Sequence, residues 1–152
     1  MKENNKEKSS VKLIEYGSSE YLQACELRYE LFFAKHNLPW STVFKDCHPE
    51  SSYAAIIFQN RVIAYGELVP QDYFTYRICQ MVVHPNYQRQ NFGRTIVLKL
   101  IELAKSKHAT SLILNSRLPA IAFYQKLGFH CFGSKFPSAT TGVMHISMKL
   151  SL

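Results

Sequence analysis

The sequence predicts an α/β protein built on a mixed, mostly antiparallel sheet of six or seven strands. Three strand-like segments between residues 53 and 83 are joined only by short turns, as in an antiparallel meander. A long amphipathic segment then separates residues 73–83 from the buried segment 111–115, so these two strands should be parallel. Two further strand-like segments close the chain.

Length and composition indicate one domain. The chain has 152 residues, 47% of them hydrophobic, and a chain of this length buries about two-thirds of its unfolded surface. Residues 1–10 are polar and aperiodic, so we expect a disordered tail followed by a single domain over residues 11–152. No run approaches the ~20 apolar residues of a membrane span, and the tail lacks the apolar core of a signal peptide. We therefore expect a cytoplasmic protein without membrane association.

The first half of the chain predicts four strands and one helix. Residues 11–16 read as a short strand, after which Gly17-Ser18-Ser19 offers an N-cap to a helix over about residues 20–36. Residues 40–52 are irregular, and loops of this length are often functional. The three strands of the meander are residues 53–59, 62–69 and 73–83.

Residues 78–107 read as a strand, a basic loop and a helix. Residues 78–83 are mostly apolar and β-branched, and Pro85 ends them because proline cannot continue a ladder. From Phe92, apolar residues recur with the helical period. The loop at residues 88–94 therefore opens a helix, whose unpaired N–H groups and dipole can bind a phosphate. The alternative is that Gly93 only lets the helix pack close to the strand.

The remaining segments complete the sheet. Residues 111–115 form a buried strand, and Pro119 begins a short helix that ends at Leu127, with Gly128 as its cap. Residues 129–132 and 143–150 are the closing strands, joined by a polar loop over residues 133–142. The 4 cysteines and 6 histidines show no ligand spacing, so we expect reduced thiols and no metal site.

The net charge of +7 is compatible with two kinds of partner. Nucleic acid is one, and a polyanionic small molecule such as coenzyme A is the other. The basic residues concentrate in the tail and near the loop at residues 88–94 rather than on an aromatic strand face, so we do not expect a nucleic-acid partner.

Two blocks of the sequence resemble motifs of the GCN5-related N-acetyltransferases (GNAT family). In the family's phosphate loop a Gln or Arg comes first and a Gly or Ala last, and here Gln88 and Gly93 hold these places. Asn91 replaces a usual glycine, a mild departure because asparagine also tolerates positive φ. Residues 120–129, AIAFYQKLGF, resemble the family's second motif. Residues 27–32 are similar to a Leu-Arg...Phe signature of the ElaA-like subgroup and of acyl-homoserine-lactone synthases.

This resemblance implies a sheet that is splayed in the middle, with helices on both faces and acetyl-CoA in the split. It also implies which residues contact the coenzyme. They are Met81, Val82 and Val83 on the donor strand, Gln88, Arg89, Gln90, Asn91, Phe92, Gly93 and Arg94 in the loop, and Asn115, Arg117, Ala120 and Phe123 further on. For Arg117, which stands at a common family asparagine, a surface role is the alternative.

The resemblance also suggests catalytic groups. Tyr124 occupies the position of an acid that protonates the departing thiolate, the alternative being a core tyrosine. Glu67 is the leading candidate for the base because it lies on the strand beside the donor strand, although a solvent-exposed glutamate is the other interpretation. Arg77 stands where some family members carry a glutamate, and His145 is either a second base or a core histidine. We expect Arg28 on the surface, the alternative being that it faces the acceptor cleft.

The sequence thus predicts an acetyl-CoA-dependent N-acetyltransferase that acts directly on a primary amine of a small-molecule or peptide acceptor. A non-catalytic acyl-CoA-binding regulatory module is the main alternative. The acceptor is not identified by the sequence, and a monomer or a homodimer is expected.

Overall fold

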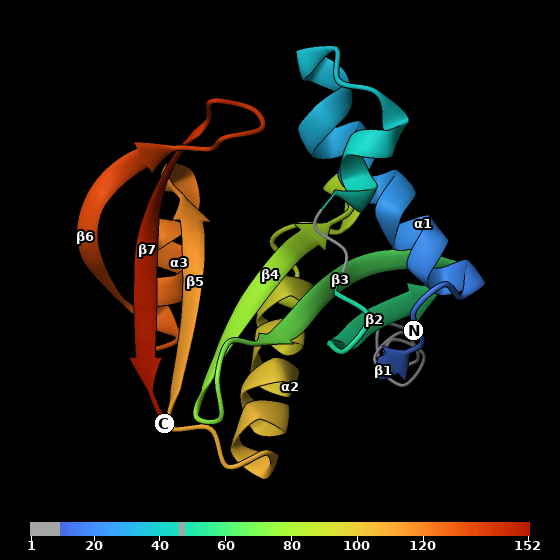
Figure 1. Ribbon diagram of the computed structural model, residues 1–152. Helices are drawn as coiled ribbons and strands as arrows, with labels where there is room; N and C mark the ends of the chain where they lie inside the picture. Colours follow the sequence, from blue (N-terminus) through green and yellow to red (C-terminus); the bar gives the residue numbers. More distant parts are fainter. Residues whose placement is uncertain (1–9, 46–47) are drawn as a thin grey trace.

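A computed structural model describes residues 10–45 and 48–152, so nearly all of the predicted tail, and Cys47, lie outside the described residues. One sheet of seven strands has the order β1-β2-β3-β4-β5-β7-β6 (Figure 1). Only the β4–β5 pair is parallel, as predicted, and all other neighbouring pairs are antiparallel. The predicted fold class is confirmed.

The elements follow the expected order. The strands are β1 (Val11–Ile14), β2 (Ser52–Phe58), β3 (Arg61–Pro70), β4 (Thr75–Val83), β5 (Ser111–Arg117), β6 (His130–Pro137) and β7 (Met144–Ser151). The α-helices are α1 (Ser19–Arg28), α2 (Phe92–Ser106) and α3 (Ile121–Lys126), and short 3-10 helices cover Trp40–Phe44, Pro85–Tyr87 and Leu118–Ala120.

The first helical segment changes its geometry near its end. The side chain of Ser18 caps α1 by accepting a hydrogen bond from the Tyr21 N–H. After Arg28 the chain continues as a π-helix, η2 (Tyr29–Phe33), and a 3-10 turn, η3 (Ala34–His36). The left-handed residue Asn37, with φ of 57°, ends it. The predicted helix is therefore one continuous helical segment from residue 19 to residue 36. Its π turn changes the direction in which the side chains after it point.

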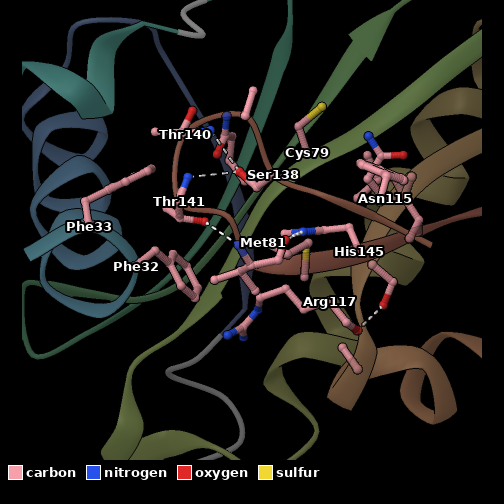
Figure 2. A pocket seen from close by; sticks show the side chains of 18 of the residues that line it. Phe32, Phe33, Cys79, Met81, Asn115, Arg117, Ser138, Thr140, Thr141 and His145 are labelled. Atoms are coloured by element: carbon pink, nitrogen blue, oxygen red, sulfur yellow. Dashed lines mark hydrogen bonds between the residues drawn. The ribbon is translucent and has the colours of Figure 1, made fainter. Parts of the chain in front are cut away.

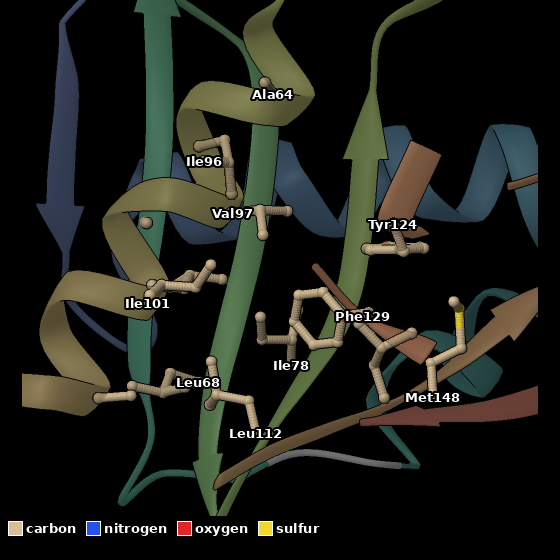
Figure 3. Packing of buried hydrophobic residues seen from close by; sticks show 14 of the residues in the cluster. Ala64, Leu68, Ile78, Ile96, Val97, Ile101, Leu112, Tyr124, Phe129 and Met148 are labelled. Atoms are coloured by element: carbon tan, nitrogen blue, oxygen red, sulfur yellow. The ribbon is translucent and has the colours of Figure 1, made fainter. Parts of the chain in front are cut away.

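Helices cover both faces of the sheet (Figure 1). On one face, α2 buries Ile96, Val97 and Leu100 in a core cluster that also contains Leu68, Ile78 and Tyr124 (Figure 3). On the other face, α1 packs Ala24 and Cys25 in a second cluster that includes Tyr65 and Val82. The close approach of α2 requires Gly66, because a Cβ there would lie 2.5 Å from the Met81 sulfur and 2.8 Å from Ile96.

The parallel pair of strands separates soon after it begins. β4 and β5 are in register only from Thr75 opposite Ser111 to Arg77 opposite Ile113. Further along β4, a β-bulge opposite Gly66 places Gln80 in the left-handed region with φ of 60°. Because the last part of β4 and the last part of β5 have no common ladder, the sheet is splayed in the middle, as expected.

The closing hairpin differs from the prediction. The predicted loop over residues 133–142 is wrong in its first half, because β6 continues to Pro137. After an irregularity in the ladder, Phe136 and Pro137 pair with His145 and Met144 of β7. The small and polar residues of this stretch predict a loop. They form a strand instead, and they are polar because most side chains of β6 are exposed.

Candidate active site

A cavity of about 600 Å³ lies where β4 and β5 separate. Its lining comes from β4, β5, Tyr124 of α3, the π turn and the loop before β7, as Figure 2 shows for most of these segments. Five of the predicted site residues line it: Met81, Asn115, Arg117, Ala120 and Tyr124. The structure therefore brings the second motif and the donor strand together.

Tyr124 is buried in this cavity, with an exposed fraction of 7%. Burial raises the pKa of its hydroxyl to about 12, because the phenolate would lose its hydration. The positive charge of Arg117 lowers this pKa, and Cys79 raises it, but both effects are smaller than that of burial. Tyr124 therefore holds its proton throughout the neutral range, as a proton donor must.

The loop before α2 contains two residues with left-handed backbone, which is the conformation that an anion-binding nest requires. Arg89 and Asn91 have positive φ values of 61° and 67°, as expected for Asn91. The Thr95 N–H donates to the Asn91 carbonyl at 3.0 Å, so the N–H groups of the preceding turn have no intrahelical acceptor. The alternative, close packing through Gly93, has little support, because a Cβ there would lie 3.4 Å from Phe123 in ordinary van der Waals contact.

Two glutamine side chains brace this loop from within. The Gln88 side chain donates to the Val83 carbonyl at 3.1 Å, and that of Gln90 donates to the Asn86 carbonyl at 3.3 Å. None of residues 88–94 lines the cavity, so the loop forms a separate part of the site. Of the other predicted contacts, Val82 is buried beneath α1, and Phe123 lies against Gly93.

The end of β4 presents main-chain groups toward the split. The His84 N–H donates to the Ile63 carbonyl at 2.7 Å, next to the pair Val83–Ala64. Val83 therefore belongs to a non-hydrogen-bonded antiparallel pair, whose own N–H and carbonyl point away from β3. These groups lie on the edge that β5 leaves open.

Glu67 lies outside the cavity lining. Its side chain is 2% exposed, so the interpretation as a solvent-exposed glutamate is wrong. The Tyr65 hydroxyl donates to Glu67 at 2.6 Å. Burial and the carboxylate beside it raise the pKa of Tyr65 far above its ordinary range.

Arg28 is buried, with an exposed fraction of 3%, so the expected surface position is wrong. Its guanidinium donates to the Gln80 side chain at 2.6 Å. The reason is the bulge in β4, where the positive φ of Gln80 redirects a polar side chain into contact with α1. A surface position followed from the helical period alone, which cannot show a bulge in a distant strand.

Two cavity residues have defined partners. The Arg117 guanidinium lies 4.8 Å from the centre of the Phe32 ring, in a cation–π contact across the cavity. His145 shares a 2.8 Å hydrogen bond between Nδ1 and the Val143 carbonyl, and its ring stacks on Phe136. Figure 2 shows Arg117 and His145 with Phe32 around the same space.

Sequence reasoning missed part of the lining. Phe32 and Phe33 reach the cavity from the π turn, which has no signal in the helical period. Residues 138–141 reach it from the loop before β7, where the Ser138 hydroxyl accepts hydrogen bonds from the N–H groups of Thr140 and Thr141. The sequence predicts that the loop over residues 133–142 borders the acceptor, but its composition does not show which of its residues line the cavity.

The match to known proteins decides the family. The model of the acetyltransferase (GNAT) family matches residues 21–129 of the chain. This chain belongs to the GNAT family. Within the described part of the chain, no helix is long and apolar enough to span a membrane.

Sequence relatives of this GNAT protein match part of its length. A UPF0039 protein of Schizosaccharomyces pombe is 29% identical over 60% of this chain and 61% of its own. A glucosamine 6-phosphate N-acetyltransferase of Trypanosoma brucei brucei is 32% identical over 45% of this chain and 51% of its own. The chain thus spans about half to three-fifths of the length of these curated relatives.

Solved GNAT structures share the fold over almost the whole chain. Escherichia coli ElaA has a TM-score of 0.77 at 18% identity, covering 93% of this chain and 98% of its own. A GNAT acetyltransferase from Elizabethkingia anophelis with acetyl-CoA bound has a TM-score of 0.74 at 16% identity, covering 96% and 99%. At these identities the likeness concerns the fold.

Proposed function

We propose that this protein is an acetyl-CoA-dependent N-acetyltransferase that moves the acetyl group directly to a primary amine. The observation that carries the proposal is a buried, protonated tyrosine in the split between β4 and β5, and the left-handed backbone of Arg89 and Asn91 in the loop before α2 supports it as a separate phosphate site. The neighbour with acetyl-CoA bound and the relative named for glucosamine 6-phosphate, whose amine is primary, are consistent with this reaction.

The chain offers a place for each part of the donor. The N–H groups of residues 89–94 would receive the pyrophosphate, and the outward N–H of Val83, whose carbonyl already accepts the Gln88 side chain, would donate to an amide carbonyl of the pantetheine arm. A side chain at position 93 would stand between the backbone and a phosphate, although it fits against the protein itself.

The reaction needs no nucleophile from the protein. The amine nitrogen attacks the thioester carbonyl carbon, and the carbon–sulfur bond breaks. The departing thiolate takes the proton of the Tyr124 hydroxyl, and the amine loses one proton, so the products are an N-acetylated amine and the free thiol. Tyr124 regains its proton from the solvent.

The amine must lose a proton before it can attack the thioester. An alkyl amine with a pKa near ~10.4 is neutral in only about one molecule in ~2,500 at pH 7. Glu67 remains our predicted base, but its carboxylate lies outside the cavity lining and accepts the Tyr65 hydroxyl.

Coenzyme release followed with a thiol reagent tests the proposal. The protein is incubated with acetyl-CoA and a panel of primary amines, and the thiol is measured against a reaction without amine. An amine-dependent release supports the transfer. Coenzyme binding by calorimetry without release from any amine would favour the non-catalytic acyl-CoA-binding alternative.

A further inference from the structure

The described lining of the cavity carries positive charge and no acidic side chain. Its cationic residues are Lys35, Arg77 and Arg117, and three histidines accompany them: His36, His48 and His145. The chain as a whole has 11 Asp and Glu residues, and none of them belongs to this lining. Low-dielectric walls around such a group of cations favour an anion inside the cavity.

Arg77 gives a second, independent indication. Its Nε is buried and has no hydrogen-bond partner among the described residues, although Arg77 lines the cavity. A buried guanidinium N–H without an acceptor is unfavourable. The Nε of Arg28 is in the same state, but only Arg77 of the two lines the cavity. Arg77 is also the last β4 residue in register with β5, so it lies where the split opens.

The coenzyme phosphates do not account for these charges. The proposed phosphate nest is formed by residues 89–94, and none of them lines the cavity. Arg117 lies over Phe32 of the π turn, and Lys35 belongs to the 3-10 turn that follows. Arg117 is also a predicted coenzyme contact, so Lys35 and Arg77 are the cations of the described lining that the acceptor would meet.

We infer that the acceptor is an amine that also carries an anionic group, a carboxylate or a phosphate. This inference rests on the proposed acetyl transfer and names its substrate class. The anionic group would accept hydrogen bonds from Arg77 and the hydroxyls of the loop at residues 138–141. A polyamine would meet like charges and no carboxylate of the described lining.

The same lining helps the amine to react. A neighbouring positive charge lowers the pKa of an ammonium group, because it disfavours the charged form. Lys35 and Arg117 therefore make a bound amine neutral somewhat more often than in water, although solvent screens both exposed side chains and the anionic group balances the charge of Arg77. This effect reduces the need for a carboxylate base in the cavity.

Matched pairs of amines test the inference. Phosphoethanolamine is compared with ethanolamine to test a phosphate group, and β-alanine is compared with its amide to test a carboxylate. Spermidine represents the polyamines. We expect the anionic member of at least one pair to have a kcat/KM about tenfold or more above its partner, which is a difference of about 1.4 kcal/mol. Equal or reversed preference in both pairs, or a preference for spermidine, would overturn the inference while leaving acetyl transfer intact.

The two proposals remain separable if no amine releases coenzyme. Calorimetry of phosphoethanolamine and β-alanine with coenzyme A present then decides. Binding of an anionic amine without binding of its neutral partner would support the anion-binding cavity and contradict the acetyl transfer. Binding of neither anionic amine would contradict the inference.

Variants that remove or keep one positive charge test whether Arg77 is responsible for the preference for anionic amines. Arg77→Gln should reduce the ratio of kcat/KM between the preferred anionic amine and its partner by about tenfold, and Arg77→Lys should restore part of it. Arg61→Gln removes the same charge from an exposed residue of β3 outside the cavity and should leave the ratio unchanged. Should Arg77→Gln not fold, Lys35→Gln, at an exposed residue, gives the same comparison. An unchanged ratio in a folded variant of Arg77 would show that Arg77 does not receive the anion.

Discussion

At the scale of single residues, Tyr124 combines burial with a position in the cavity. If its hydroxyl protonates the departing thiolate, Tyr124→Phe should lower kcat by about 10²- to 10⁴-fold, the usual contribution of a positioned acid. Coenzyme affinity should change little, because only a hydroxyl is removed. The rate is measured with an accepted amine, under conditions in which chemistry limits turnover, and a melting curve checks the fold.

Tyr87→Phe provides the matched control, since Tyr87 contacts Phe92 but does not line the cavity. Its rate should equal that of the wild type. A purely structural role for Tyr124 would appear as a stability change of about 1 kcal/mol with an unaltered rate, and that result would reject the acid.

The backbone conformation of Asn91 leads to a prediction about coenzyme affinity. With φ of 67° and no side-chain cap on α2, Asn91 contributes its backbone, so Asn91→Gly should bind coenzyme A as well as the wild type or slightly better. Asn91→Ala should bind less well, because alanine disfavours positive φ. Titration calorimetry measures both variants. A large loss in Asn91→Gly would mean that the amide side chain contacts the ligand.

At the scale of elements, the junction of β4, the loop and α2 makes a prediction for Gly93. A Cβ at this position would touch Phe123 and Val83 at 3.4 and 3.5 Å, so Gly93→Ala should fold normally. Gly93→Val should lose coenzyme affinity, because its branched side chain obstructs the approach of phosphate to the backbone. Calorimetry at two salt concentrations should show wild-type binding that weakens with salt. Undiminished affinity in a folded Gly93→Val would exclude the nest.

The elements also show what the sequence could predict. The helical period of α2 and the long connection between β4 and β5 gave a helix and a parallel pair, because both depend on local pattern and chain connectivity. The π turn at Tyr29–Phe33 and the bulge at Gln80 have no comparable local signal. Both are decided by packing between distant segments, and together they determine where Phe32 and Arg28 lie.

At the scale of the whole molecule, the sheet consists of two halves joined over a short ladder. The half with β1–β4 carries α1 and α2 on opposite faces, and the half with β5–β7 carries α3 (Figure 1). Three register pairs of β4 and β5 connect the halves before the cavity opens. Tyr124, the proposed acid, is buried at this opening. The protonation of its hydroxyl is therefore coupled to folding.

That coupling predicts a loss of stability in alkali. Below pH 10 Tyr124 is protonated in both the folded and the unfolded chain, so its contribution to stability is fully present. As pH rises from the ordinary value of 10 toward the folded pKa of about 12, the unfolded chain releases the proton first and the free energy of unfolding falls. Between pH 8 and pH 11 the wild type should lose about 1.4 kcal/mol more than Tyr124→Phe.

Urea denaturation at the two pH values measures this difference. Tyr65, whose pKa is also raised by burial, is present in both proteins and adds the same loss to each. Tyr73→Phe removes a hydroxyl from a residue that is 90% exposed and should lose as much stability as the wild type between the two pH values. Equal losses in the wild type and Tyr124→Phe would mean that the Tyr124 hydroxyl reaches solvent in the folded protein, which would contradict the buried acid on which the proposed mechanism depends.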